Sequence, residues 1–241
     1  MKALDRKLLR DLRLMWSQAL TIALVVASGV GGFVTSLSAV DSLASARDDF
    51  YADGHFADVF AAVRRAPNAL ADTLRGVPGV ADVQTTVQAV VRVDIPGSPD
   101  PVIGQLIGID ARRPARMNQV RVSAGQTLAA AGLHADGSIP ALVSEGFAQA
   151  RGLELGDSLN VLMNGKRRTL RMVGTALSPE FIFAGLWGMP DMRGYGIFWI
   201  DHDTLAAAYD MGGAFNQVAV KLAPGASERA VTDALARRLS A

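Results

Sequence analysis

The stretch from Leu14 to Val40, LMWSQALTIALVVASGVGGFVTSLSAV, contains no formally charged residue and directly follows a basic N-terminus. A helix rises about 1.5 Å per residue, so roughly 20 residues cross the hydrocarbon core of a bilayer, which is about 30 Å thick. The uncharged run is long enough to cross with some tilt. We therefore expect a transmembrane helix over residues 14–40, with the rest of the chain on one side of the membrane.

The charges that flank this run predict its orientation. Basic residues dominate before it: Lys2, Arg6, Lys7, Arg10 and Arg13 against Asp5 and Asp11. Acidic residues dominate after it: Asp41, Asp48, Asp49, Asp53 and Asp58 against Arg47. Cytoplasmic flanks of membrane helices collect Lys and Arg. We therefore expect the N-terminus in the cytoplasm and the main domain in the periplasm, outside a bacterial inner membrane.

The residues before the run predict a second membrane contact. Leu4, Leu8 and Leu12 recur at helical spacing with Lys and Arg between them. This pattern is typical of an amphipathic helix, here residues 1–13, that lies in the inner leaflet against membrane lipids. A cleaved signal peptide is the alternative, because residues 44–46 (Ala-Ser-Ala) have the form that a signal peptidase accepts. Signal-peptide cores span about 7–15 residues, so the longer run here favours a retained anchor.

Small residues recur along the expected membrane helix. Ala23, Ala27 and Gly31 form one row at four-residue spacing, and Ser28 and Gly32 belong to the neighbouring row. Small side chains allow a second helix to approach closely, which is how helices pack in lipid. The rows are therefore a candidate helix-packing surface. The competing interpretation is that Gly and Ala are simply common in such helices.

Composition and motifs argue against several classes of function. The formal net charge is +1, which argues against nucleic-acid binding. There are no cysteines, and His55, His134 and His202 are too scattered along the chain to predict a metal site. The glycines of residues 29–32 lack the pattern of a phosphate-binding loop. We expect no catalytic residue, no metal, no cofactor and no enzymatic activity.

Beyond the run, the sequence predicts a helical stalk followed by alternating strands and helices. The stalk is residues 41–55. Strands are expected at 56–63, 80–95, 102–110, 141–144, 158–163, 168–176, 195–201 and 217–222, and helices between 67 and 76 and at 145–151, 204–209 and 227–241. Asn164-Gly165 is the strongest hairpin signal. Ser227 and Glu228 are typical of a helix N-terminus.

One loop is unusually apolar. Residues 178–196, SPEFIFAGLWGMPDMRGYG, concentrate large apolar side chains among Gly and Pro without a helical or strand period. Exposed apolar clusters mark interaction sites, and Met and Trp adapt well to hydrophobic partners. The candidate contact residues are Phe181, Phe183, Leu186, Trp187, Met189 and Met192. The alternative is a loop packed on its own domain.

The order of these segments resembles a known family. The basic start, the membrane helix and the stalk are followed by FADVFAAV from Phe56 and VPGVADVQ from Val77. The segment LVSEGFAQARGLELGDSLNVLMNGKRRTLRMVGTALSPE begins at Leu142, and FNQVAVKLAPGASERAVTDAL begins at Phe215. Together they resemble the N-terminal half of an ABC-transporter permease of the MacB and FtsX type, with the periplasmic core domain that interrupts its first two membrane helices. The individual motifs are diffuse, and their joint order carries the resemblance.

The resemblance implies an α+β fold with two lobes outside the membrane. A mixed α/β lobe similar to a transporter porter fold would comprise residues 56–110 and 215–241, and an inserted β-rich lobe would comprise residues 111–214. The implied partners are a separate cytoplasmic ABC ATPase, other permease helices or a second permease copy, and a periplasmic partner. The chain itself would be a non-catalytic permease that moves a hydrophobic cargo such as lipid or lipoprotein.

The sequence departs from this family pattern at its C-terminal end. It stops at Ala241, inside a predicted helix and without further membrane spans. On that basis we expect a fragment or the product of a truncated gene. Two other functions stay open: a membrane-anchored periplasmic binding or sensing module, and an FtsX-like activator of envelope enzymes.

Overall fold

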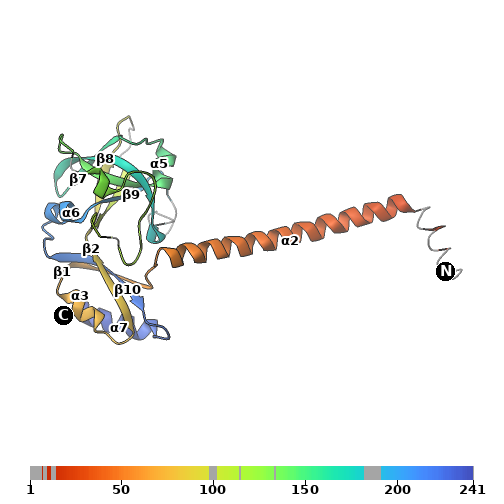
Figure 1. The fold of residues 1–241 in the computed structure, drawn as a ribbon, viewed down its shortest axis with the longest axis horizontal. Coiled ribbons are helices and arrows are strands. Elements are labelled where there is room, and N and C mark those ends of the chain that lie inside the picture. Colours follow the sequence, from red (N-terminus) through yellow and green to blue (C-terminus); the bar gives the residue numbers. More distant parts are fainter. Residues whose placement is uncertain are drawn as a thin grey trace. The chain divides into compact units, whose positions relative to one another are not determined.

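The computed structural model describes residues 7, 10–11, 15–97, 102–113, 115–132, 134–181 and 191–240. The chain divides into two units, Met1–Phe50 and Tyr51–Ala241 (Figure 1). Most of the predicted amphipathic helix at residues 1–13 lies outside the described residues. Lys7, Arg10 and Asp11 are described there, and all three are helical.

The uncharged run and the stalk form one helix. Helix α2 is Trp16–Asp53, 38 residues without a break, so the uncharged run and most of the segment expected as the stalk lie in the same helix. Two residues later the chain turns at His55, whose φ of 49° lies in the left-handed region. This turn separates the helix from the first strand.

One sheet has three antiparallel strands in the order β1-β10-β2. The strands are β1 (Val59–Pro67), β10 (Ala214–Leu222) and β2 (Val80–Thr86), and the helices beside them are α3 (Leu70–Arg75) and α7 (Glu228–Leu239) (Figure 1). Alternating apolar residues of the strands pack with Leu74 and Val77 and with Val231 and Leu235 of α7 in one core. The three-stranded sheet and its helices therefore combine the first and the last segments of the Tyr51–Ala241 unit.

A second sheet has seven strands in the order β5-β8-β6-β9-β4-β3-β7. Their bounds are β3 (Gln88–Asp94), β4 (Val102–Ile109), β5 (Arg121–Gly125), β6 (Ile139–Ser144), β7 (Ser158–Met163), β8 (Lys166–Leu177) and β9 (Tyr195–Asp201). Because β7 also pairs with β8, six of the strands close into a ring, and β5 pairs with β8 outside it. The pairs β4–β9 and β6–β8 are parallel, and the others are antiparallel.

Both faces of β9 are buried, so this strand marks the centre of the second sheet. Phe198 and Ile200 pack with α5 (Glu145–Arg151) and α6 (His202–Ala208) in one core. Ile197 and Trp199 point to the other face and pack in a second core with Leu128 of the short helix α4 (Leu128–Ala131). A strand covered on both faces reads as a continuous apolar run, as YGIFWI does.

The structure corrects three details of the predicted organisation. Residues 80–95 form two strands in different sheets, and the chain passes between the sheets at Val87. The predicted porter-like lobe extended to residue 110, but β3 and β4 pair within the seven-stranded sheet. Pro67 ends β1 instead of starting a helix, which is possible because β1 is an edge strand. The resemblance of the first lobe to a porter fold stays a prediction.

Candidate functional site

Helix α2 presents an apolar surface along the predicted membrane run. Among the described residues it is the one helix that is long and apolar enough to cross a membrane by length and composition, with a mean hydropathy of 1.9 over its most apolar window and no buried residue there. The hydroxyls of Thr21, Ser28 and Thr35 donate to carbonyls of the same helix at 2.9, 2.9 and 2.8 Å. These polar groups are satisfied without water, as a lipid environment requires.

The rows of small residues on α2 are open in the structure. Ala23, Ala27 and Ser28 are exposed, and a Cβ added at Gly31 or Gly32 would meet nothing within 4 Å. Their role in helix packing stays a prediction.

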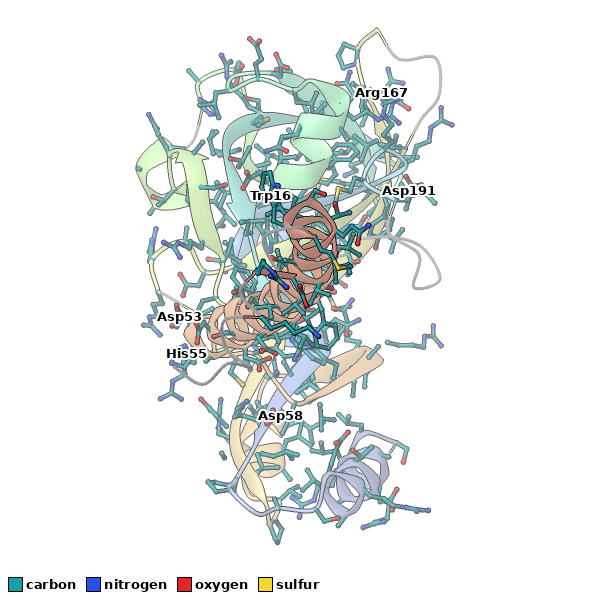
Figure 2. The ribbon with its side chains drawn as sticks, turned by 90° about the vertical axis from the view of Figure 1, so that its right-hand side faces the viewer. Trp16, Asp53, His55, Asp58, Arg167 and Asp191 are labelled. Carbon is teal, nitrogen blue, oxygen red and sulfur yellow. The ribbon has the colours of Figure 1, made fainter. Side chains whose placement is uncertain are left out.

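The residues that follow the stalk are fixed to β10. Asp53, His55 and Asp58 follow one another where the chain leaves α2 and enters β1 (Figure 2). The Lys221 ammonium bonds Asp58 Oδ1 at 2.8 Å, and the Leu222 backbone N–H donates to Asp58 Oδ2 at 2.8 Å. Both oxygens of this carboxylate thus hold the start of β1 against its neighbouring strand.

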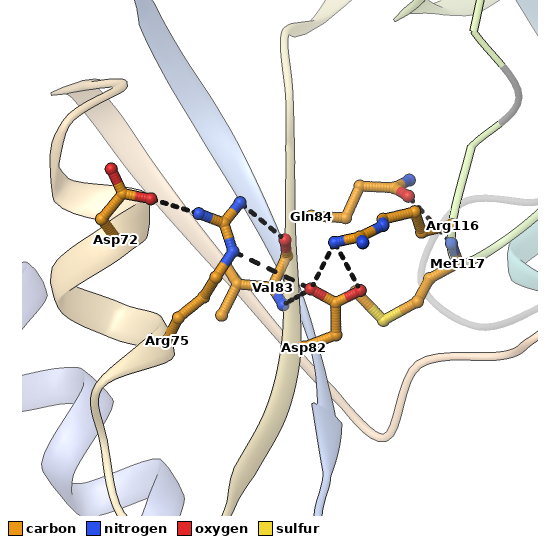
Figure 3. Close-up of polar contacts among 7 residues, drawn as sticks. All are labelled: Asp72, Arg75, Asp82, Val83, Gln84, Arg116 and Met117. Atoms are coloured by element: carbon orange, nitrogen blue, oxygen red, sulfur yellow. Dashed lines mark hydrogen bonds and ion pairs between the residues drawn. The ribbon is translucent and has the colours of Figure 1, made fainter.

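An ion-pair cluster holds the segment after β4 against β2 (Figure 3). Arg75 of α3 bonds Asp72 and approaches Asp82 of β2, with 3.8 Å between Nε and Oδ1. Asp82 also pairs with Arg116, at 3.4 Å, and accepts the Val83 backbone N–H at 2.8 Å. Exposed ion pairs of this kind contribute little stability. The cluster brings Arg116 of the segment after β4 beside Asp82 of β2.

The two ends of the predicted contact loop are described, and its middle is not. Four of the six candidate residues lie outside the described residues: Phe183, Leu186, Trp187 and Met189. Phe181 is partly buried, and its ring packs edge-on against Trp199 with 6.3 Å between centroids. Met192 has 43% of its side chain surface exposed. Exposure of the loop as a whole therefore stays a prediction.

Phe181 and Met192 line one cavity of about 280 Å³. Glu145 and Gln149 of α5 line its other side. Met192 lies directly over α5, since a Cβ at Gly146 would be 2.9 Å from its Sδ atom. The residues that enter and leave the predicted contact loop therefore meet at the same small, mainly apolar hollow.

A partly buried carboxylate stands just before Phe181. Glu180 lies in the short 3-10 helix η1 (Pro179–Phe181), and its Oε2 accepts a hydrogen bond from Asn118 Nδ2 at 2.9 Å. Burial raises the pKa of Glu180 above its ordinary value, and hydrogen bonds from the side chains of Gln88 and Asn118 offset part of this effect. Glu180 is therefore easier to protonate in the folded protein than in the unfolded chain.

The raised pKa predicts a pH dependence of stability. A carboxyl group whose pKa is higher in the folded state stabilises that state fully below the unfolded pKa, about 4.3, and loses this contribution as the pH rises through the folded pKa. We expect wild-type protein to lose stability relative to Glu180→Gln as the pH rises from about 4 to 8. Urea unfolding of both proteins across this range measures the difference. Parallel stability curves would contradict the assignment.

A chain of amides connects the two sheets beside this carboxylate. Gln88 N–H donates to Asn216 Oδ1 at 2.8 Å, and Asn216 Nδ2 donates to the Gln88 carbonyl at 2.7 Å. Gln105 Nε2 donates to Gln88 Oε1 at 2.6 Å, and the Tyr195 hydroxyl donates to Gln105. Burial raises the pKa of Tyr195. The chain runs from β10 through β3 and β4 to β9.

His134 and His202, which the sequence separates widely, line one cavity of about 800 Å³. His134 Nε2 is buried there without a hydrogen-bond partner. The described residues nevertheless contain no group of three His, Cys, Asp or Glu side chains that is placed to hold a metal ion. Two histidines that lie far apart in the sequence therefore line the same cavity.

Sequence analysis missed Asn118 and Glu180. Their partners are about 60 residues away along the chain, so no local pattern announces them. The residue type is the one weak signal in the sequence. Asn is among the residues that most readily tolerate the left-handed region, and Asn118 adopts a φ of 48°. The candidate contact residues, in contrast, were visible in the sequence, and the first of them, Phe181, directly follows Glu180.

The chain is distantly similar to several solved structures. The extracellular domain of the noncanonic ABC-type transporter YknZ from Gram-positive bacteria is 14% identical, with 70% of this chain and 78% of that chain covered and a TM-score of 0.42. The periplasmic region of MacB from Actinobacillus actinomycetemcomitans is 13% identical over 77% of each chain, with a TM-score of 0.41. A domain of a putative permease from Porphyromonas gingivalis is 17% identical over 74% of this chain and 71% of that chain, with a TM-score of 0.42.

The family assignment rests on sequence. No curated protein matches the chain significantly. The family model of the MacB-like periplasmic core domain matches residues 19–238, which include most of α2, the stalk and both sheets. The chain therefore belongs to the MacB-like periplasmic core domain family of ABC-transporter permeases.

Proposed function

We propose that this chain is the N-terminal part of a permease that couples ATP hydrolysis in the cytoplasm to the movement of a hydrophobic cargo, such as lipid or lipoprotein, outside the inner membrane. The observation that carries the proposal is the unbroken helix α2, which runs from the uncharged segment into the stalk, followed by a core that belongs to the MacB-like family. An unbroken helix of this kind would carry displacement along its own length, from the membrane segment into the stalk.

Charge supports the proposed orientation, with the N-terminus in the cytoplasm. Lys7 and Arg10 precede the uncharged run, while Asp48 and Asp49 follow it, in agreement with the distribution of Lys and Arg around membrane helices. The core from Tyr51 onward then lies in the periplasm. In this orientation the folded core does not meet cytoplasmic ATP.

Membership in an ABC-transporter family implies a partner ATPase. We assign ATP hydrolysis to this separate cytoplasmic subunit and a non-catalytic role to the chain itself. The exposed rows of α2, which include Gly31 and Gly32, would receive other permease helices or a second permease copy. Membrane lipids would cover the remainder of the apolar helix surface.

The contact with cargo or with a periplasmic partner is assigned to the loop from Phe181 to Met192. The support is its density of large apolar side chains in the sequence and the position of its two ends at one apolar hollow. Large apolar and aromatic side chains dominate the energetics of binding surfaces. A hydrophobic cargo would gain most from these side chains.

Replacing Phe183, Leu186 and Trp187 together with serine tests this assignment. In the intact permease–ATPase complex in nanodiscs, we expect binding of a fluorescent triacylated lipopeptide or phospholipid to weaken roughly tenfold or more, because contact side chains of this type each contribute more than about 1 kcal/mol. The melting temperature should change little. Fluorescence anisotropy and thermal unfolding measure the two quantities on the same samples.

The matched control replaces three exposed apolar residues elsewhere: Val90, Leu155 and Leu162, which are 68%, 53% and 49% exposed. This triple serine variant should bind the lipopeptide as wild type does. A loop variant that melts far lower would identify the loop as buried core, since each large core truncation costs about 2–5 kcal/mol. Unchanged binding and transport in the loop variant would equally reject the contact role.

A further inference from the structure

Asn118 bonds two segments that lie far apart in the sequence. It is 5% exposed. Its backbone N–H donates to the His55 carbonyl at 3.2 Å, and its side-chain Oδ1 accepts the Ala57 N–H at 3.0 Å. On the other side, its carbonyl accepts the Ser178 hydroxyl at 3.3 Å, and its Nδ2 donates to Glu180 at 2.9 Å. One residue therefore holds both the end of the stalk and the start of the apolar loop.

The neighbours of Asn118 hold it in place. Gln119 N–H donates to the Gly54 carbonyl at 2.9 Å, which adds a second bond to the end of the stalk. Met117 N–H donates to Gln84 Oε1 at 2.9 Å (Figure 3), and the Met117 side chain is buried with Ala219 of β10. The segment that carries Asn118 is thus tied to the three-stranded sheet on one side and to the stalk on the other.

Among the described residues, the hydrogen bonds between the end of the stalk and the start of the loop run through residue 118. In that part of the chain, no hydrogen bond joins residues 54–57 to residues 178–181. An Asn side chain suits the position because it offers an acceptor and a donor together, whereas Asp offers no donor and an alkyl side chain offers neither. Asn also tolerates the left-handed backbone found here.

We propose that Asn118 is a positioning residue that transmits displacement of the stalk end, through Ser178 and Glu180, to the root of the apolar loop at Phe181. The inference rests on the proposed function, because that function supplies both the moving stalk and the contact role of the loop. It adds the specific connection between them. Asn118 itself touches neither cargo nor nucleotide; it acts through the residues to which it is bonded.

Hydrogen exchange in the intact permease–ATPase complex tests this connection. In wild type, ATP turnover should alter amide exchange both at residues 54–58 and at residues 178–181. Asn118→Gly keeps the left-handed backbone and removes the side-chain amide. In this variant, exchange at Ala57 should be roughly fivefold faster, since its acceptor is lost. The response to ATP should persist at residues 54–58 and weaken at residues 178–181, because the side-chain bonds to Ala57 and Glu180 are lost while the backbone bonds to His55 and Ser178 remain.

Three further variants separate positioning from general damage. Asn118→Asp places two carboxylates in contact and should also weaken the response, whereas Asn118→Asp combined with Glu180→Gln reverses donor and acceptor and should restore it. Asn164→Gly is the matched control: Asn164 also has a positive φ, 44°, but lies in the β7–β8 hairpin. It should leave both responses unchanged.

The outcomes distinguish this inference from the proposed function. A response at residues 178–181 that is as large in Asn118→Gly as in wild type would overturn the inference alone. A wild-type response at residues 54–58 without one at residues 178–181 would do the same. If ATP turnover alters neither segment in wild type, the stalk does not carry motion, and the proposed coupling falls together with the inference.

Discussion

Replacing Phe198 with alanine should lower the free energy of unfolding of the Tyr51–Ala241 unit by about 3–5 kcal/mol. Phe198 is fully buried, and its ring packs edge-on against Phe147 of α5 with 5.5 Å between centroids. Because strands on both sides of β9 are paired within the closed ring, the surroundings cannot collapse into the cavity. Urea unfolding of the detergent-solubilised protein, followed by tryptophan fluorescence, measures the change.

Two glycines indicate how closely the Phe198 side chain is packed. A Cβ at Gly196 would lie 2.8 Å from Phe198 Cε2, and a Cβ at Gly104 would lie 2.9 Å from the same atom. Gly196→Ala should therefore cost about 1–3 kcal/mol through overpacking. The cost should shrink when Phe198→Leu is introduced as well, because the two sites share one contact.

The exposed residue Leu162 provides the control for this core prediction. Its side chain is 49% exposed on β7, so Leu162→Ala should change the free energy of unfolding by about 0.5 kcal/mol or less. If Phe198→Ala lowers the free energy of unfolding by less than about 1 kcal/mol, the core of the six-stranded ring is not tightly packed around this side chain.

Elements with a local chemical cause could be predicted from the sequence. Helix α5 ends where expected because Gly152 adopts a φ of 64°. Asn164 and Gly165 turn the β7–β8 hairpin with φ values of 44° and 76°. The Ser227 side chain accepts the Ala230 N–H at the start of α7. In each case one or two residues determine the backbone, so neighbouring sequence is sufficient.

Pairings between distant segments could not be predicted in the same way. Residues 80–95 are rich in β-branched residues throughout, and this pattern does not reveal that the chain changes sheet at Val87. The parallel pairing of β4 with β9 joins residues about 90 positions apart, and parallel neighbours leave no turn signal between them. Strand β5 and helix α4 are short and were not predicted at all.

The candidate site likewise has features that are visible in the sequence and features that depend on contacts between distant segments. The apolar character of residues 181–192 is visible in the sequence because it needs only composition. The carboxylate of Glu180 and the amide of Asn118 become a pair only when the chain between them has folded. Their roles rest on burial and on hydrogen bonds across about 60 residues, which no periodicity encodes.

The topology of α2 should give an all-or-none result in labelling experiments. The chain contains no cysteine, so a single introduced cysteine is the only site for a maleimide. Lys7→Cys lies before the uncharged run, and Leu155→Cys replaces a side chain in the core that is 53% exposed. Because basic flanks stay in the cytoplasm, a membrane-impermeant maleimide should distinguish the two positions completely.

The decisive measurement is labelling of these two variants in spheroplasts with an intact inner membrane. Membrane-anchored permease function predicts that Leu155→Cys is labelled at once and that Lys7→Cys is labelled only after the membrane is opened. Both variants should retain residues 1–46. Labelling in the reverse order, or a mature protein that begins at Arg47, would contradict the assignment of α2 as a retained helix that links a cytoplasmic ATPase to a periplasmic core.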